Sequence, residues 1–113
     1  LVTRVDLIEA AARDVACNAV LLKPNQVGTL SETRQAMLTA RKHGFGMVVS
    51  ARSGETEDTA ISHIATGWNT GQLKVGSFAR SERMAKWNEC LRIEELLGKN
   101  TSYAGKYGLK LAL

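Results

Sequence analysis

The chain has 113 residues, of which 44% are hydrophobic, 5% aromatic and 23% charged. This length is typical of one domain with its own apolar core. The net charge is +4, but the basic residues are dispersed among Asp and Glu, and the few aromatic residues offer no stacking platform; we therefore expect no nucleic-acid partner.

No signal peptide or long apolar run is visible, so we expect no membrane partner and a cytoplasmic location. Cys17 and Cys90 lack metal-type spacing and are expected to be reduced packing residues.

The first half of the chain alternates between helical spacing and apolar runs. Residues 3–6 resemble a helix cap, and the helix that follows would bury one face formed by Val5, Ile8, Ala12 and Val15. The run 19–22 predicts a buried strand. A capping box at residues 29–32 opens a second helix that ends at Gly44, and its apolar positions include Met37, Leu38 and Ala40. The run 46–50 predicts a second strand.

The second half repeats this order. Residues 58–68 have helical spacing, with one face formed by Ile61, Ile64, Ala65 and Trp68. The run 72–76 predicts a third strand. A last helix is predicted from Ser81 to a stop at Gly98, with one face formed by Met84, Trp87, Cys90, Leu91, Glu94 and Leu97. Continuous apolar strands are typical of parallel sheets covered on both faces. The predicted class is therefore α/β, with three parallel strands alternating with helices.

Three parallel strands on their own leave two sheet edges without hydrogen-bond partners. We therefore interpret residues 1–113 as the C-terminal segment of a larger barrel domain, with the remainder expected upstream.

Polar clusters follow the predicted strands, in KPNQVGT (23–29), ARSGETEDT (51–59) and GQLKVG (71–76). Parallel α/β proteins bind their ligands at the carboxyl ends of their strands. Burial and a nearby second cation both favour the neutral form of a lysine, so Lys23, with Lys74 as the second cation, could remove a proton from a substrate. A charged lysine could instead stabilise the resulting carbanion.

Arg52 offers a planar donor fork, Ser53 a hydroxyl and Gly54 a close backbone approach, which together could cradle a phosphate or carboxylate. A simpler interpretation remains for each cluster. Either lysine could be a surface cation that extends its stem over apolar groups, and the Arg52 segment could be a helix cap with a surface ion pair to Glu55 or Glu57. The repetition of such clusters at successive strand ends favours a site for a small anion.

The segments LLKPNQVGTLSET, VVSARSGETEDT, GQLKVG and ARSERMAKWNECLRIEELLG closely resemble the C-terminal barrel segment of the enolases, from near Leu1 to about Gly105. The resemblance implies an enolase-type (β/α) barrel and a lyase, a phosphopyruvate hydratase of glycolysis. Such an enzyme catalyses the magnesium-dependent dehydration of 2-phosphoglycerate to phosphoenolpyruvate. By the same resemblance Lys23 is the base that removes the carbon 2 proton. Lys74 contacts the substrate carboxylate and stabilises the enediolate, and Arg52 and Ser53 bind the phosphate.

The chain departs from the enolase pattern at two places. Ala51 stands where enolases typically carry the histidine of SHRSGETED, and Val75 and Phe78 lie where IKTGAP is usual. These departures fit an enolase-superfamily paralogue that acts on a related phospho- or phosphono-carboxylate. They also fit a non-catalytic, enolase-like binding protein.

The resemblance places the three magnesium carboxylates, and the acid that assists departure of the hydroxyl group, upstream of Leu1. We therefore assign no metal ligand in this segment and expect it to be inactive alone. Its acidic residues are expected to serve helix starts, where carboxylates are favoured; they are Asp6, Glu55, Glu57 and Asp58. The implied partners are a small anionic phosphorylated substrate and, for the full-length protein, a second copy in a homodimer.

Overall fold

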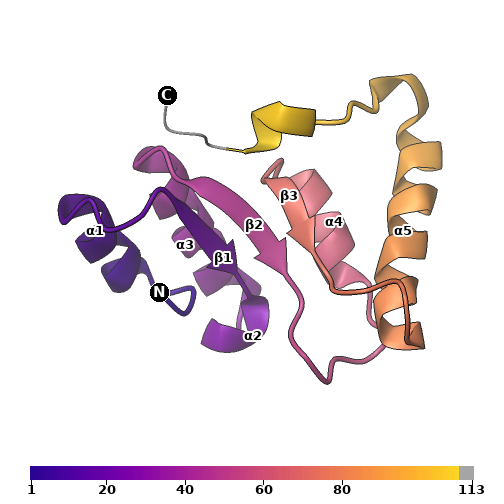
Figure 1. Ribbon diagram of the computed structural model, residues 1–113, viewed down its shortest axis with the longest axis horizontal. Helices are drawn as coiled ribbons and strands as arrows, with labels where there is room; N and C mark the ends of the chain where they lie inside the picture. Colours follow the sequence, from indigo (N-terminus) through magenta and orange to yellow (C-terminus); the bar gives the residue numbers. More distant parts are fainter. Residues whose placement is uncertain (110–113) are drawn as a thin grey trace.

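The computed structural model describes residues 1–109. In chain order its elements are α1 (Val5–Arg13), β1 (Ala19–Leu22), α2 (Pro24–Val27), α3 (Leu30–Lys42), β2 (Gly46–Ser50), α4 (Ala60–Gly67), β3 (Gly71–Lys74), α5 (Ser81–Leu97), and the 3-10 helices η1 (Gly98–Asn100) and η2 (Gly105–Gly108). The strands form one sheet in the order β1-β2-β3, and both neighbouring pairs are parallel (Figure 1). The predicted α/β class, with three parallel strands alternating with helices, is confirmed.

One face of the sheet is covered by helices. Leu22, Val49 and Leu73 are register partners across the three strands, and Leu22 and Val49 are fully buried on this face. Helices α3 and α4 pack against the strands, α1 packs on α3, and α5 packs on α4 (Figure 1). The buried side chains that complete this core include Ile8, Ala36, Met37, Ala40, Phe45, Ile61, Ile64 and Ala65.

The opposite face of the sheet carries the next row of register partners, Leu21, Val48 and Gln72. Leu21 is 39% exposed, and among residues 1–109 the one helix that forms a hydrogen bond with this row is the short 3-10 helix η2, through Gln72. The prediction that both faces are covered is therefore wrong for the described part of the chain. An apolar row on an open face is what a sheet needs if it continues into a closed barrel, because the interior of such a barrel is packed with side chains.

The start of the chain differs from its prediction. Helix α1 begins after Arg4 with no side-chain cap, and Thr3 is instead buried, where it contacts the end of β1. Val15 was expected in the apolar face of this helix, but it lies beyond Arg13, where α1 ends, and is exposed. The spacing of apolar residues continued past the point where the helix stops.

Helix α3 begins as predicted. The Glu32 backbone N–H donates to Thr29 Oγ1 at 3.1 Å, and the Thr29 hydroxyl donates to Glu32 Oε2 at 2.6 Å. Each side chain therefore satisfies a polar group at the start of the helix.

Helix α5 presents a different face to α4 from the one predicted. Lys86 and Ile93, two turns apart, are its buried residues, whereas Leu91 is 64% exposed. An exposed contact between polar groups joins α4 and α5 at Glu89, which also bonds to Arg92 within α5. His63 Nε2 lies 2.8 Å from Glu89 Oε1, and Arg92 donates to Glu89 Oε2 at 2.7 Å. Hydrogen bonds from Arg92 first and then from His63 hold the pKa of Glu89 below its ordinary value.

The segment after α5 returns to the amino-terminal end of β3 (Figure 1). Gln72 Nε2 donates to the Gly108 carbonyl at 2.8 Å. A Cβ atom at Gly108 would lie 2.7 Å from the Gly71 carbonyl oxygen, so this approach requires glycine. No helix among residues 1–109 is long and apolar enough to cross a membrane.

Candidate active site

The carboxyl ends of the strands bring the two predicted lysines to one edge of the sheet. Lys74 is the last residue of β3 and is the register partner of Ser50. Lys23 directly follows Leu22, whose partner is Val49, so Lys23 lies at the carboxyl end of β1, next to that of β2. Lys23 and Lys74 are thus separated by one strand, a Cα spacing of about 10 Å for two strand intervals. The third strand was predicted at 72–76 but spans Gly71–Lys74, which leaves Val75 and Gly76 in the following turn.

Lys23 is held by its backbone. Its N–H donates to Thr3 Oγ1 at 2.9 Å, and the Thr3 hydroxyl donates to Gln26 Oε1 at 2.7 Å. Lys23 is half-buried and is the N-cap residue of the short helix α2. Sequence reasoning missed α2, although Pro24 at its first position and Gly28 after its end, at φ 93°, are the expected signals.

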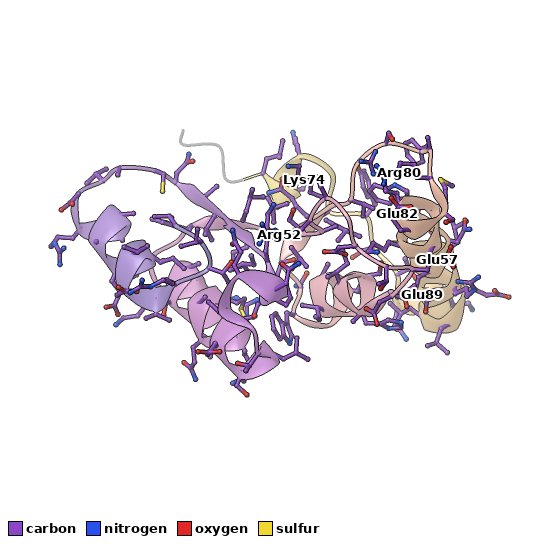
Figure 2. All side chains as sticks on the ribbon, turned by 90° about the horizontal axis from the view of Figure 1, so that it is seen from below. Arg52, Glu57, Lys74, Arg80, Glu82 and Glu89 are labelled. Carbon is purple, nitrogen blue, oxygen red and sulfur yellow. The ribbon has the colours of Figure 1, made fainter. Side chains whose placement is uncertain are left out.

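Arg52 and Ser53 lie in the loop of residues 51–58, which connects β2 to α4. The Ala51 N–H donates to the Lys74 carbonyl at 2.9 Å, so the loop leaves the sheet beside Lys74. Figure 2 shows Arg52 and Lys74 at this edge. Gly54 turns the loop at φ 77°, a left-handed conformation that glycine adopts without strain.

The alternative interpretation, a surface ion pair from the Arg52 side chain to Glu55 or Glu57, is not found among residues 1–109. The Arg52 backbone N–H donates instead to Glu55 Oε1 at 2.7 Å. The Arg52 guanidinium has no hydrogen-bond or ion-pair partner among residues 1–109 and is exposed. It is therefore available to an anion.

A cavity of about 520 Å³ opens next to this loop. It is lined by α2, the loop and the start of α4, through Pro24, Asn25, Leu30, Arg52, Ser53, Gly54, Glu55, Thr56, Asp58, Ala60, Ile61 and Ile64. Lys74 lines a separate groove on the open face, with Leu21, Val48 and Gln72. The structure thus brings Arg52 and Ser53 into one cavity and Lys74 into the groove of the open face, whereas Lys23 lines a separate cavity with Leu21 and Gln26.

Two of the three carboxylates of the 51–58 loop are engaged by other parts of the protein. Glu55 contacts the Arg52 N–H and, at 3.3 Å, the Lys86 ammonium, while Asp58 Oδ1 accepts from the Ala60 N–H at 2.8 Å. Asp58 therefore serves a helix start, as predicted. No group of three or more His, Cys, Asp or Glu side chains among residues 1–109 could hold a metal ion.

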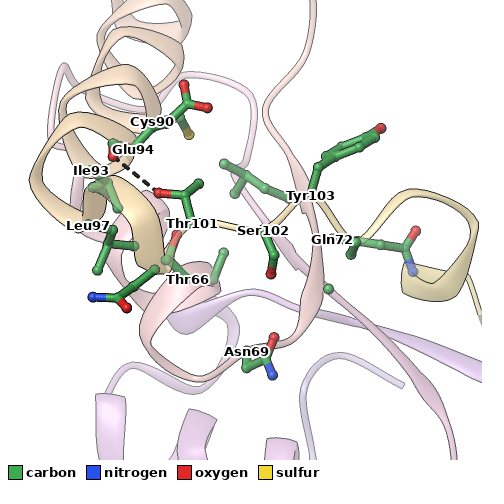
Figure 3. A pocket seen from close by; sticks show the side chains of 15 residues that line it. Thr66, Asn69, Gln72, Cys90, Ile93, Glu94, Leu97, Thr101, Ser102 and Tyr103 are labelled. Atoms are coloured by element: carbon green, nitrogen blue, oxygen red, sulfur yellow. Dashed lines mark hydrogen bonds between the residues drawn. The ribbon is translucent and has the colours of Figure 1, made fainter.

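A second cavity, of about 440 Å³, lies at the other end of β3, between α5 and the returning C-terminal segment (Figure 3). Thr101 Oγ1 donates to the Glu94 carbonyl at its wall. Cys90 lines it and is half-buried, whereas Cys17 is exposed and is not the packing residue that was expected. None of the predicted site residues lines this cavity.

The sequence of the chain matches the family model described as "Enolase, C-terminal TIM barrel domain" over residues 1–111. The chain belongs to this enolase family. It is 54% identical over 104 residues to "Enolase" of Ehrlichia chaffeensis (92% of this chain, 25% of that protein). It is also 54% identical over 99 residues to "Enolase" of Anaplasma marginale (88% and 23%) and over 104 residues to "Enolase 1" of Desulfitobacterium hafniense (92% and 24%). The chain thus spans about a quarter of the length of these enolases.

The positions that depart from the enolase pattern lie around the same edge. Ala51 is buried in the hydrophobic core, directly before Arg52. Phe78 is exposed, and its ring stacks on Trp87 with centroids 5.4 Å apart. Trp87 lines the groove that contains Lys74, and its Nε1 atom is buried without a hydrogen-bond partner among the described residues. The departures from the enolase pattern therefore lie beside both parts of the candidate site.

Proposed function

We propose that residues 1–113 supply the base and the anion-binding side chains of an enolase-type active site, within a longer chain that carries the rest of the barrel. The reaction is the magnesium-dependent dehydration of 2-phosphoglycerate to phosphoenolpyruvate, a lyase step of glycolysis. One observation carries the proposal: Lys23, Lys74 and the Arg52–Ser53 loop meet at the carboxyl edge of one parallel sheet.

In the proposed reaction, Lys23 Nζ takes the proton from carbon 2 of the substrate. The electron pair of the broken C–H bond moves into the carboxylate to form an enediolate. The Lys74 ammonium stabilises the added negative charge, since a cation placed where charge develops lowers the barrier. Arg52 and Ser53 hold the phosphate through charge-assisted hydrogen bonds. The electron pair of the enediolate then forms the double bond between carbons 2 and 3 as the hydroxyl group leaves carbon 3 as water, with the proton that it needs supplied from outside this segment.

The magnesium ligands are proposed to lie outside residues 1–113, because the resemblance to the enolases places them upstream and because Glu55 and Asp58 of the 51–58 loop are already engaged by the protein. The relatives' length, about four times that of this chain, supports a longer protein. A cytoplasmic location and a homodimer of the full-length protein are part of the same proposal.

Ala51 favours a second candidate function. A methyl group neither donates nor accepts a hydrogen bond, so the donor that enolases typically place beside Arg52 is missing here. The Arg52 guanidinium and the Ser53 hydroxyl remain. This combination supports a paralogue that binds a related phospho- or phosphono-carboxylate and turns over 2-phosphoglycerate poorly. Loss of all turnover, with anion binding retained, would instead define a non-catalytic binding protein.

Two measurements on one preparation of the full-length protein separate these functions. Calorimetry with phosphoenolpyruvate and magnesium measures anion binding, and a coupled assay measures phosphoenolpyruvate formation from 2-phosphoglycerate. Binding with efficient turnover supports the enolase reaction, and binding with slow turnover supports the paralogue. If the full-length protein binds no phosphoenolpyruvate, the proposed site is wrong.

A further inference from the structure

Lys86 of α5 is a buried cation whose side chain is 1% exposed. Its ammonium donates to the carbonyl oxygens of Thr56 and Glu82, each at 2.8 Å, and lies 3.3 Å from Glu55 Oε2. These three oxygens match the three donors of an ammonium group. Two of them belong to the 51–58 loop, about 30 positions earlier in the chain.

Glu55 connects this cation to the candidate site. One carboxylate oxygen of Glu55 lies against Lys86, and the other accepts the hydrogen bond from the Arg52 N–H. The 51–58 loop is thus fastened to α5 at the Thr56 carbonyl and at the Glu55 carboxylate. Figure 2 shows this span, from Arg52 at the sheet to Glu57 and Glu82 beside α5.

The point on α5 to which the loop is fastened is itself fixed. The buried Ser62 hydroxyl on α4 donates to the Lys86 carbonyl at 2.9 Å, which joins the two helices at the same residue. The loop is therefore fastened to a residue of α5 that is itself bonded to α4.

Packing alone does not explain a lysine at this position. Removing a charge from water is costly, and an apolar side chain of similar volume often stabilises a fold as well or better. Helix α5 buries Lys86 while it leaves Leu91 and Leu96 exposed. One hydrogen bond and the ion pair of Lys86 connect it to the loop, and its other hydrogen bond stays within α5.

We propose that Lys86 and Glu55 are positioning residues that hold the 51–58 loop so that Arg52 and Ser53 face the phosphate of the substrate. The inference rests on the proposed function. Neither residue touches the anion: Lys86 acts through Glu55 and the Thr56 carbonyl, and Glu55 acts through the Arg52 backbone.

The test uses the full-length protein and four variants: Lys86→Met, Glu55→Ala, the double variant, and Glu57→Ala. Met keeps most of the length and volume of lysine without its charge. Glu55 lies on a loop, so its replacement removes no apolar core side chain, and Lys86 keeps the Thr56 and Glu82 carbonyls as partners. Glu57 is an exposed carboxylate of the same loop and serves as the matched control. Calorimetry measures phosphoenolpyruvate affinity, steady-state kinetics gives KM and kcat, and amide hydrogen exchange reports on Arg52 and Ser53.

We expect Lys86→Met and Glu55→Ala each to weaken phosphoenolpyruvate binding and raise KM about tenfold, with kcat changed less than threefold, because Lys23 lies on another strand. The double variant should be little worse than either single one, since both residues act on one loop. Amide exchange at Arg52 should be faster in all three, and Glu57→Ala should match the wild type.

Contrary results separate the two proposals. If the wild type binds phosphoenolpyruvate but both single variants bind it equally well, the positioning inference is wrong and the proposed function stands. The positioning inference would also be wrong if the double variant lost affinity by the product of the two single-variant factors, or if amide exchange at Arg52 stayed unchanged in the variants. If the wild type binds no phosphoenolpyruvate, both proposals fail together.

Discussion

Removal of the Arg52 guanidinium should weaken anion binding without affecting the fold. The group is exposed and has no partner among residues 1–109, so Arg52→Ala should change the free energy of unfolding by less than about 0.5 kcal/mol. A hydrogen bond to a charged group contributes about 1.5–3 kcal/mol. At about 1.4 kcal/mol for each tenfold change, the dissociation constant for phosphoenolpyruvate should rise roughly 10- to 150-fold.

Calorimetry on the full-length protein with magnesium measures this loss. Arg52→Lys should be intermediate, because it keeps the charge but loses the two-pronged geometry. Arg34→Ala removes an equal charge from the exposed side of α3 and should have little effect. If Arg52→Ala binds within twofold of the wild type, or if Arg34→Ala loses as much, Arg52 does not bind the anion.

Three further results are expected. Residues 1–113 expressed alone should aggregate or lack a cooperative melt, because one sheet face is uncovered; a monomeric, cooperative melt by calorimetry would contradict this. In the full-length protein, Ala51→His should raise 2-phosphoglycerate turnover at least tenfold in a coupled assay, although a larger side chain in the core costs about 1–3 kcal/mol of stability; unchanged turnover would show that Ala51 does not limit the reaction. Arg92 and His63 lower the pKa of Glu89 in the folded protein. The stability that this carboxylate contributes is therefore present above the pKa that Glu89 has in the unfolded chain, and it is lost as the pH falls through the pKa that Glu89 has in the folded protein. Glu89→Gln should therefore lower the Tm at pH 7 but hardly at pH 3, and an equal loss at both would refute the assignment.

Local patterns predicted the parts of the fold that neighbouring residues determine. The Thr29 and Glu32 capping box formed as expected, and the apolar runs at β1 and β2 became parallel strands with the same bounds. The location of each strand also gives the location of its carboxyl end. The placement of Lys23, Arg52 and Lys74 at one edge could therefore be predicted from the sequence.

Contacts between distant residues could not be predicted in this way. Thr3 resembled a helix cap, but its hydroxyl accepts from the Lys23 N–H, 20 positions away. Helical spacing on α5 favoured apolar positions such as Leu91, whereas the helix buries Lys86, because two of its three partner oxygens come from the 51–58 loop. No pattern of neighbouring residues indicates a buried lysine when its hydrogen-bond partners come from a distant part of the chain.

The most direct test of the account is the exchange of the carbon 2 proton of the substrate with solvent in the full-length protein. Lys23→Ala should abolish this exchange and leave the affinity for phosphoenolpyruvate largely unchanged, because a base acts in the chemical step and not in binding. Nuclear magnetic resonance of 2-phosphoglycerate in deuterated water, followed with the wild type and the variant, measures it. Exchange at the wild-type rate in Lys23→Ala would remove Lys23 from the mechanism and contradict the proposed active site.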